Sequence, residues 1–187
     1  MDIKLIALIL THSLSLGYYN LIKTEMKYVR IINPKVSVDE ARQIAFWITY
    51  YAKKYQLDPE VAFCMARAES HFRVDADSGV AGGILQVNYY YWDVDKHKLL
   101  NDLKYSIKEG IKVIKYTFDL VDKISNKPND TPLYKYLLVY HGGPRRFYAR
   151  RLTRKERIYV RNVYRCLDWI DYNFDNEKID MRRWERR

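Results

Sequence analysis

The stretch Val61-Ala-Phe-Cys-Met-Ala-Arg-Ala-Glu69-Ser70 is an almost uninterrupted apolar run that ends in a carboxyl group. Asp58 and Pro59 stand just before it, and they supply a helix N-cap and a proline suited to the first helical turn. We therefore predict a helix that begins there and carries Glu69. Because this helix is apolar nearly all round, it should be central and buried.

Glu69 shares a face of that helix with apolar side chains. They are Ala62, Met65 and Phe72. Burial on such a face disfavours the charged form, so the pKa of Glu69 should rise. A carboxylic acid that stays protonated near neutral pH suits the general acid of glycosidic bond cleavage. The alternative is a solvated glutamate at a helix end, or one paired with Arg67 or Arg73, since structural ion pairs also perturb carboxyl groups.

Capping boxes and helical periodicity divide the rest of the chain. We expect helices over about residues 37–56, 101–124, 131–140 and 153–172, with a polar loop at 125–130. Between residues 73 and 88 the periodicity stops, and Gly79, Gly82 and Gly83 predict turns. The predicted fold class is mainly α, in a single domain, with a short β-hairpin or irregular segment around residues 73–88.

Both ends of the chain lie outside this domain. Residues 1–17 are either a signal peptide, cleaved after the small-x-small pattern Ser15-Leu16-Gly17, or an N-terminal helix that packs on the domain. The apolar stretch from Leu5 to Leu16 has 12 residues, which is too few to span a bilayer. We place an extension at 18–36, the domain at 37–173 and a basic tail at 174–187.

The chain is strongly basic, with a formal net charge of +10. From His141 to Arg187 there are 14 Lys and Arg against 7 Asp and Glu. Such a surface favours a polyanionic partner, which could be nucleic acid, anionic lipid or the carboxylate-rich bacterial wall, although a merely solvated basic helix has the same composition. The 18 tyrosines and 4 tryptophans suit a groove that stacks on sugars or bases.

Cysteine and histidine give no sign of a metal site. Cys64 and Cys166 both fall in apolar helical stretches, so we expect two buried thiols, with a single disulfide as the alternative. The four histidines show no ligand spacing. We therefore expect neither a catalytic metal nor another cofactor.

Three short motifs occur in order: Glu69-Ser70, then Gly83-Ile-Leu-Gln86-Val-Asn88, then Val139-Tyr140-His141-Gly142-Gly143-Pro144. Their order and spacing resemble the soluble lytic transglycosylase family of the lysozyme-like superfamily, which includes goose-type lysozymes. The family pattern is Glu-Ser, Gly-Leu-Met-Gln and Ala-Tyr-Asn-Ala-Gly, often followed by a Tyr-Val helix like Tyr159-Val160 here. The resemblance covers about residues 40–170. The Gln-Val-Asn form is similar to small members that serve secretion machines, pili or phage particles.

The resemblance implies a lysozyme-like domain with Glu69 as the single catalytic acid/base, supported by the Tyr140 hydroxyl. It assigns other residues to substrate binding: Ser70, Gln86, Asn88, Tyr89, His141 and Gly143. Ser70 would hold the substrate or the carboxyl group, and Gln86 would line the groove near the scissile sugar. The cluster from Tyr89 to Trp92 could stack on sugar rings or belong to an aromatic core. His141 and Gly142 replace the usual Asn and Ala, and the loop from Ser78 to Gln86 is one residue shorter than in the family.

The implied function is that of a peptidoglycan lytic transglycosylase, which cleaves the β-1,4 bond between N-acetylmuramic acid and N-acetylglucosamine and forms a 1,6-anhydro ring. A hydrolytic muramidase would need a second carboxylate from four nearby residues: Asp75, Asp77, Asp93 or Asp95. We interpret all four as solvated loop charges. Two further hypotheses are a non-catalytic wall-binding or assembly protein, and a nucleic-acid-binding protein suggested by the eight arginines from Arg145 to Arg165.

The expected partners are peptidoglycan glycan strands and a secretion-machine or virion component. Nucleic acid is not an expected partner. The expected location is the periplasm or cell envelope, or outside the cell, with a phage virion as the alternative.

Overall fold

The computed structural model describes residues 16–174. Within them are seven α-helices, two short 3-10 helices and one small antiparallel sheet. In chain order the elements are α2 (Leu16–Ile32), α3 (Val38–Lys54), α4 (Pro59–Ser70), β1 (Ala81–Gly82), β2 (Val87–Asn88), α5 (Lys96–Asn101), α6 (Leu103–Ser125), η1 (Pro128–Asp130), α7 (Leu133–Gly142), η2 (Pro144–Tyr148) and α8 (Arg154–Phe174). The prediction of a mainly helical domain with a short hairpin near residues 73–88 is confirmed.

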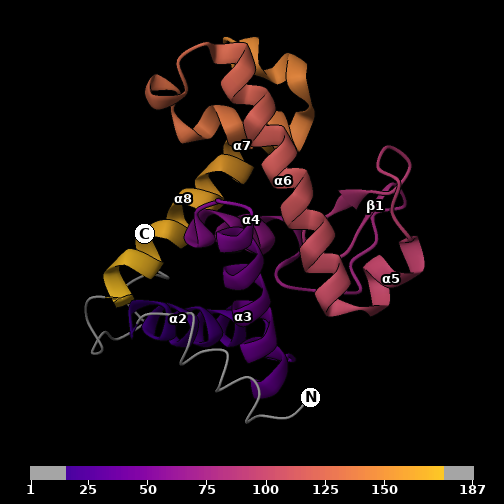
Figure 1. The fold of residues 1–187 in the computed structure, drawn as a ribbon, viewed down its shortest axis with the longest axis vertical. Coiled ribbons are helices and arrows are strands. Elements are labelled where there is room, and N and C mark those ends of the chain that lie inside the picture. Colours follow the sequence, from indigo (N-terminus) through magenta and orange to yellow (C-terminus); the bar gives the residue numbers. More distant parts are fainter. Residues whose placement is uncertain (1–15, 175–187) are drawn as a thin grey trace.

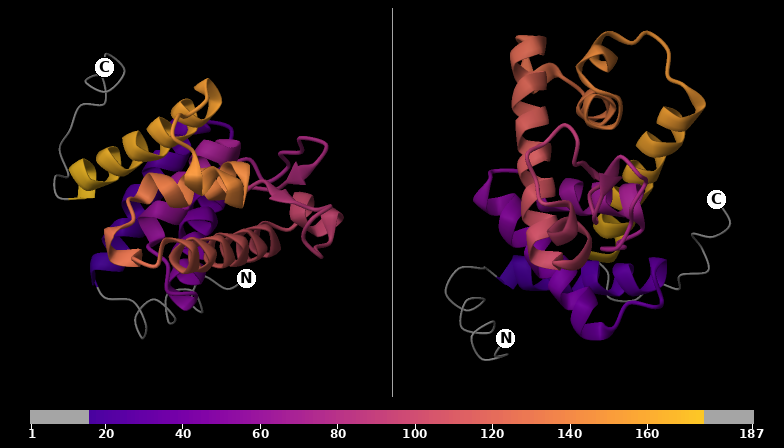
Figure 2. Two further views of the ribbon diagram at one scale, coloured as in Figure 1. Left: turned by 90° about the horizontal axis from the view of Figure 1, so that it is seen from above. Right: turned by 90° about the vertical axis from the view of Figure 1, so that its right-hand side faces the viewer.

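Helix α4 is the centre of the fold. It packs against α3 and α8 and also contacts α2 (Figure 1). Five consecutive residues of α4, from Ala62 to Ala66, are buried, as predicted from its apolar circumference. In the right-hand view of Figure 2, α6 and α8 stand on either side of α7, and α2 and α3 form the base. The hairpin and α5 project to one side of α6 (Figure 1).

Side-chain caps confirm the predicted starts of α3, α4 and α8, whereas α7 begins after Pro132 without such a cap. Ser37 accepts a hydrogen bond from the Glu40 amide at 3.1 Å, and Asp58 accepts one from the Glu60 amide at 2.9 Å. At the start of α8 the cap is reciprocal, since the Thr153 amide donates to Glu156 Oε2 at 2.7 Å and the Glu156 amide donates to Thr153 Oγ1 at 3.3 Å. These bonds satisfy amides that a helix leaves without an internal partner.

The segment at 18–36, which we expected to be an extension outside the domain, is mostly helical and packs on the domain. Most of it belongs to α2, which packs on α3, and its residues Leu21 and Val29 join the core. The Tyr28 ring lies 4.6 Å from that of Trp169 on α8. Most of the predicted signal peptide, residues 1–15, lies outside the described residues, as does the tail beyond residue 174. No helix in the described part is both long and apolar enough to cross a bilayer.

The expectation of two free thiols is wrong, because Cys64 and Cys166 form a disulfide. Both residues are fully buried where α4 and α8 lie side by side, with their Cα atoms 5.5 Å apart. This packing joins residues separated by 102 positions, which helical periodicity could not reveal. A cross-link that closes so long a loop stabilises a domain by about 4 kcal/mol, chiefly by restricting the unfolded chain.

Candidate active site

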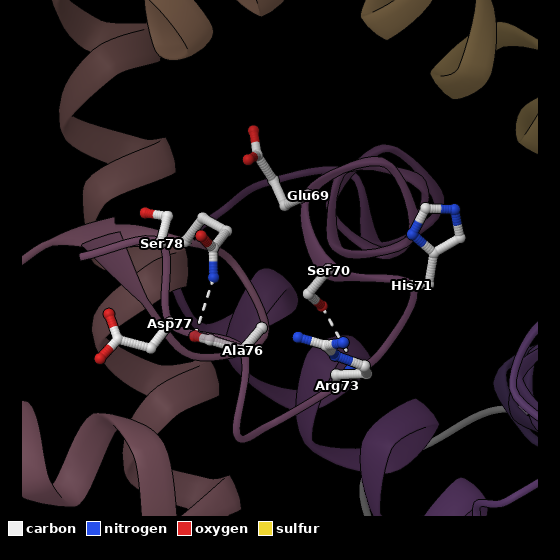
Figure 3. Close-up of a pocket in the computed structure, with 8 residues that line it drawn as sticks. Glu69, Ser70, His71, Arg73, Ala76, Asp77 and Ser78 are labelled. Atoms are coloured by element: carbon white, nitrogen blue, oxygen red, sulfur yellow. Dashed lines mark hydrogen bonds between the residues drawn. The ribbon is translucent and has the colours of Figure 1, made fainter. Parts of the chain in front are cut away.

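Glu69 lies in the last turn of α4, where the backbone turns sharply. His71 and Phe72 follow in the left-handed region, with φ values of 55° and 62°. The Phe72 side chain is fully buried, so packing holds this uncommon conformation. The turn leads the chain from α4 into the segment before β1, and the space between them is a pocket of about 400 Å³. Eight residues line it (Figure 3): Glu69, Ser70, His71, Arg73, Ala76, Asp77, Ser78 and Gln86.

The Glu69 carboxyl group keeps its proton to a higher pH than an ordinary glutamate does. Burial raises its pKa from 4.5 to about 7, and a contact with the Tyr159 hydroxyl acts in the opposite direction. The raised pKa predicted from the helical face is thus confirmed. The alternative of an ion pair fails within the described residues, because Arg73 lies instead near Asp75, at 3.8 Å, and Arg67 lies beside the Tyr28 hydroxyl.

Two tyrosine hydroxyls from distant helices reach the neighbourhood of Glu69. The Tyr159 hydroxyl is buried, and the Glu69 carboxyl group is its nearby acceptor, although the two do not form a hydrogen bond of standard geometry. The Tyr140 hydroxyl donates to the Leu85 carbonyl at 2.6 Å, and burial and the charge of Glu69 both raise its pKa. The predicted proximity of Tyr140 to Glu69 is therefore observed, but its proton is held by the backbone.

The segment from Gly83 to Gln86 is fixed to three helices. Ser70 Oγ donates to the Ile84 carbonyl at 2.8 Å, and the Ile84 amide donates to Ser106 Oγ at 3.1 Å. With the Tyr140 bond to Leu85, the segment is tied to α4, α6 and α7 at two consecutive residues. The three motifs recognised in the sequence therefore meet at one place.

Gly83 is required where this segment approaches α6. Its φ is +77°, and a Cβ atom there would lie 2.2 Å from Ser106 Oγ and 2.9 Å from the Leu99 carbonyl. Gln86, at φ 47°, donates from Nε2 to the carbonyls of Ala76 and Gly83, both at 3.0 Å. These bonds place the Gln86 amide at the pocket wall, as predicted. The Ser70 hydroxyl, in contrast, is already engaged in its bond to the Ile84 carbonyl.

Other predicted binding residues do not line the pocket. Asn88 Oδ1 caps a turn, because the amides of Tyr90 and Tyr91 both donate to it at 3.0 Å. His141 stacks on Tyr159 with ring centres 4.4 Å apart, and Gly143 ends α7 with a φ of 83°.

The four aromatic residues from Tyr89 to Trp92 have different surroundings. Tyr90 and Tyr91 are 77% and 74% exposed, so they are not an aromatic core. Trp92 packs edge-on against Tyr116 at 5.1 Å. Tyr89 instead donates its hydroxyl to Asp77 at 3.0 Å.

Asp77 is an exposed loop residue, as expected, but its carboxylate is held by several bonds. The Gly79 amide and the Tyr89 hydroxyl donate to its Oδ1 at 2.9 and 3.0 Å, and Lys96 Nζ lies 3.0 Å from Oδ2. These bonds lower its pKa, so it is ionised at a pH where Glu69 is still protonated. Figure 3 shows Glu69 and Asp77 on different walls of the pocket, one from α4 and the other from the segment that precedes β1.

The other three aspartates have different surroundings. Asp95 accepts from the Lys98 amide at 3.0 Å and caps α5, and Asp93 and Asp75 are exposed. In the described part of the chain, no group of three or more His, Cys, Asp and Glu residues is placed to hold a metal ion.

The sequence motifs assign no role to Tyr159, which belongs to the Tyr-Val pattern of α8. They also do not distinguish Asp77 from the three other candidate aspartates. Comparisons with protein-family models, curated proteins and solved structures find no match to this chain.

Proposed function

We propose that this protein is a peptidoglycan lytic transglycosylase with Glu69 as its acid/base. The supporting observation is a carboxyl group whose pKa is about 7, at the wall of a pocket shared with Gln86 and near two tyrosine hydroxyls. Such a group can give up a proton and take one back at neutral pH, as both halves of this reaction require.

In the first step, Glu69 protonates the oxygen of the β-1,4 bond, and the bond between this oxygen and C1 of N-acetylmuramic acid breaks. Positive charge then develops at C1. The newly formed Glu69 carboxylate faces the Tyr159 hydroxyl, whose contact favours the ionised form. Glu69 next takes the proton of the sugar's own 6-hydroxyl, whose oxygen bonds to C1. This closes the 1,6-anhydro ring and restores the protonated acid without a water molecule.

Asp77 favours one second candidate, a hydrolytic muramidase. It supplies an ionised carboxylate in the pocket that holds the protonated Glu69. Two carboxyl groups whose pKa values are pushed apart are typical of hydrolytic glycosidases, in which they lie about 5–9.5 Å apart. In that reaction, water rather than the 6-hydroxyl would attack C1.

Digestion of purified sacculi distinguishes these functions. Mass spectrometry of the released muropeptides should show anhydro-muramic ends, which are lighter than hydrolysed ends by one water. Asp77→Asn should retain this product if Asp77 only orders the loop. Reducing ends alone, lost in Asp77→Asn, would establish hydrolysis instead. Failure of the native protein to release any material, while Glu69→Gln still binds sacculi, would favour a wall-binding or assembly protein.

The disulfide supports the proposed location. Disulfides persist in the periplasm and outside the cell, and they are rare in the reducing cytoplasm. The Cys64–Cys166 bond therefore agrees with an envelope or secreted protein that acts on glycan strands. A phage virion, or a secretion machine in the envelope, would present the same conditions.

A further inference from the structure

The densest positive charge of the described chain surrounds η2 and the first half of α8. Between Gly142 and Leu167 the sequence holds nine lysines and arginines but one acidic residue, Glu156. Glu156 is buried, and Arg146 Nη2 already donates to its carboxylate at 2.6 Å. Six of the exposed cations make up what we call the basic lobe: Arg145, Arg150, Arg151, Arg154, Lys155 and Arg161.

The basic lobe adjoins the candidate active site. It follows α7, which carries Tyr140, and part of it belongs to α8, which carries Tyr159 (Figure 2). The charges of Glu156 and Lys155 both reach the His141 ring, and that ring stacks on Tyr159. On the opposite side of Glu69, the pocket wall includes the exposed Arg73. The contacts from Glu69 to Tyr159, and from His141 to Lys155, thus place the edge of the lobe near the candidate active site.

This arrangement fits a ligand that enters the pocket and carries acidic groups along its length. Guanidinium groups pair with carboxylates through two parallel hydrogen bonds. A duplex nucleic acid could cover the lobe but is too wide for a pocket of about 400 Å³. A peptidoglycan strand meets both conditions, because the sugar chain is narrow and each peptide stem on it bears carboxylates.

We infer that the basic lobe binds the carboxylates of peptidoglycan stem peptides, so the protein prefers strands that retain their stems. This inference depends on the proposed function, since it takes the glycan as the occupant of the pocket. It adds a specificity that the pocket alone does not provide.

The experiment measures binding to sacculi in a Glu69→Gln background, where no cleavage alters the ligand. Arg150→Gln, Arg151→Gln and Arg154→Gln are combined in one protein. A control protein carries Lys27→Gln, Arg30→Gln and Lys54→Gln, three exposed cations on α2 and α3 that remove the same charge. Each protein is tested on intact sacculi and on sacculi stripped of stems by an amidase. Circular dichroism establishes that both fold.

The lobe variant should bind intact sacculi about tenfold more weakly than the control, which is the expected effect of losing three exposed ion pairs. On stripped sacculi the two proteins should bind equally. Equal binding to intact sacculi, or an equal loss on both ligands, would overturn the inference. So would a loss confined to duplex DNA or to vesicles of anionic lipid, tested in parallel. Solubilisation of sacculi by the native protein tests the proposed function separately.

Discussion

The hydroxyl of Tyr140 donates a 2.6 Å hydrogen bond to the carbonyl of Leu85, which is 55 residues away in the sequence. Ser70 binds the carbonyl just before it, that of Ile84. The helix that carries the proposed acid and the helix that carries Tyr140 therefore hold neighbouring peptide groups of one segment. A small displacement of either helix would move Gln86, and with it the wall of the pocket.

Replacing Tyr140 with Phe should loosen this segment. The Leu85 carbonyl would remain buried without its donor, which costs about 1–2 kcal/mol. We expect a lower melting temperature and reduced turnover. Tyr148→Phe, at a residue that is 71% exposed, should change neither. If Tyr140→Phe loses turnover at unchanged stability, the hydroxyl acts on the reaction itself.

Glu69→Gln should abolish sacculus digestion and also raise stability at alkaline pH. Below pH 4.5 the carboxyl group is protonated in both the folded and the unfolded chain. Its burial therefore does not reduce the free energy of unfolding at that pH. Between pH 4.5 and about 7 the unfolded chain releases the proton and the folded protein retains it, so stability falls as pH rises. This difference corresponds to about 3 kcal/mol.

Glutamine cannot ionise and avoids this loss. The melting temperature of Glu69→Gln should therefore exceed that of the native protein at pH 8 and match it near pH 4.5. Calorimetry at both values measures this difference. Asp168→Asn, at an exposed residue of α8, serves as the control. A difference that does not depend on pH would contradict the assignment of Glu69 as an acid with a raised pKa.

Tyr159→Phe should shift the pH profile of digestion. The Tyr159 hydroxyl lowers the pKa of Glu69, so its removal should raise that pKa further. A general acid loses activity as pH rises through its pKa. The alkaline limb of the rate profile should consequently move to higher pH in the variant. If the alkaline limb does not shift and the rate is lower at every pH, Tyr159 contributes through packing and not through the pKa of Glu69.

Gly83→Ala and Gly79→Ala form a matched pair. Both glycines have positive φ, at +77° and +85°, so alanine costs about 1–2 kcal/mol at either. At Gly79 no atom lies within 4 Å of the added Cβ, whereas at Gly83 Ser106 Oγ would lie 2.2 Å away. Chemical denaturation should show the larger loss for Gly83→Ala, by a further 1–3 kcal/mol or so. Equal losses would mean that Ser106 on α6 can move away from the added Cβ atom at little cost.

The sequence predicted those elements whose signals are local. Helix α4 begins at Asp58 and Pro59 because a cap and a proline need only their neighbours. Helix α2 was missed because its buried face includes Glu25, which is fully buried and accepts a hydrogen bond from Thr49 at 3.0 Å. A carboxyl group on that face interrupts the apolar pattern from which a buried helix is recognised.

The site was predicted to the extent that its residues belong to short motifs. Glu69, Gln86 and Tyr140 were identified in this way, and they do gather around one region. Tyr159 and Asp77 depend on tertiary contacts, the first through the packing of α8 on α4 and the second through bonds from Gly79, Tyr89 and Lys96. The bond from Gly79 is local, two residues from Asp77, but no spacing along the chain encodes the bond from Tyr89 or the packing of α8 on α4. The same is true of the partners Cys64 and Cys166.

The covalent bond between Cys64 and Cys166 lies five residues before Glu69 on one helix and seven after Tyr159 on the other. It therefore fixes α4 and α8 relative to each other close to Glu69 and Tyr159. A newly synthesised chain that has not been oxidised lacks this bond, and only noncovalent packing then aligns the pair. The alignment of Glu69 with Tyr159 is thereby coupled to the redox conditions that the chain meets.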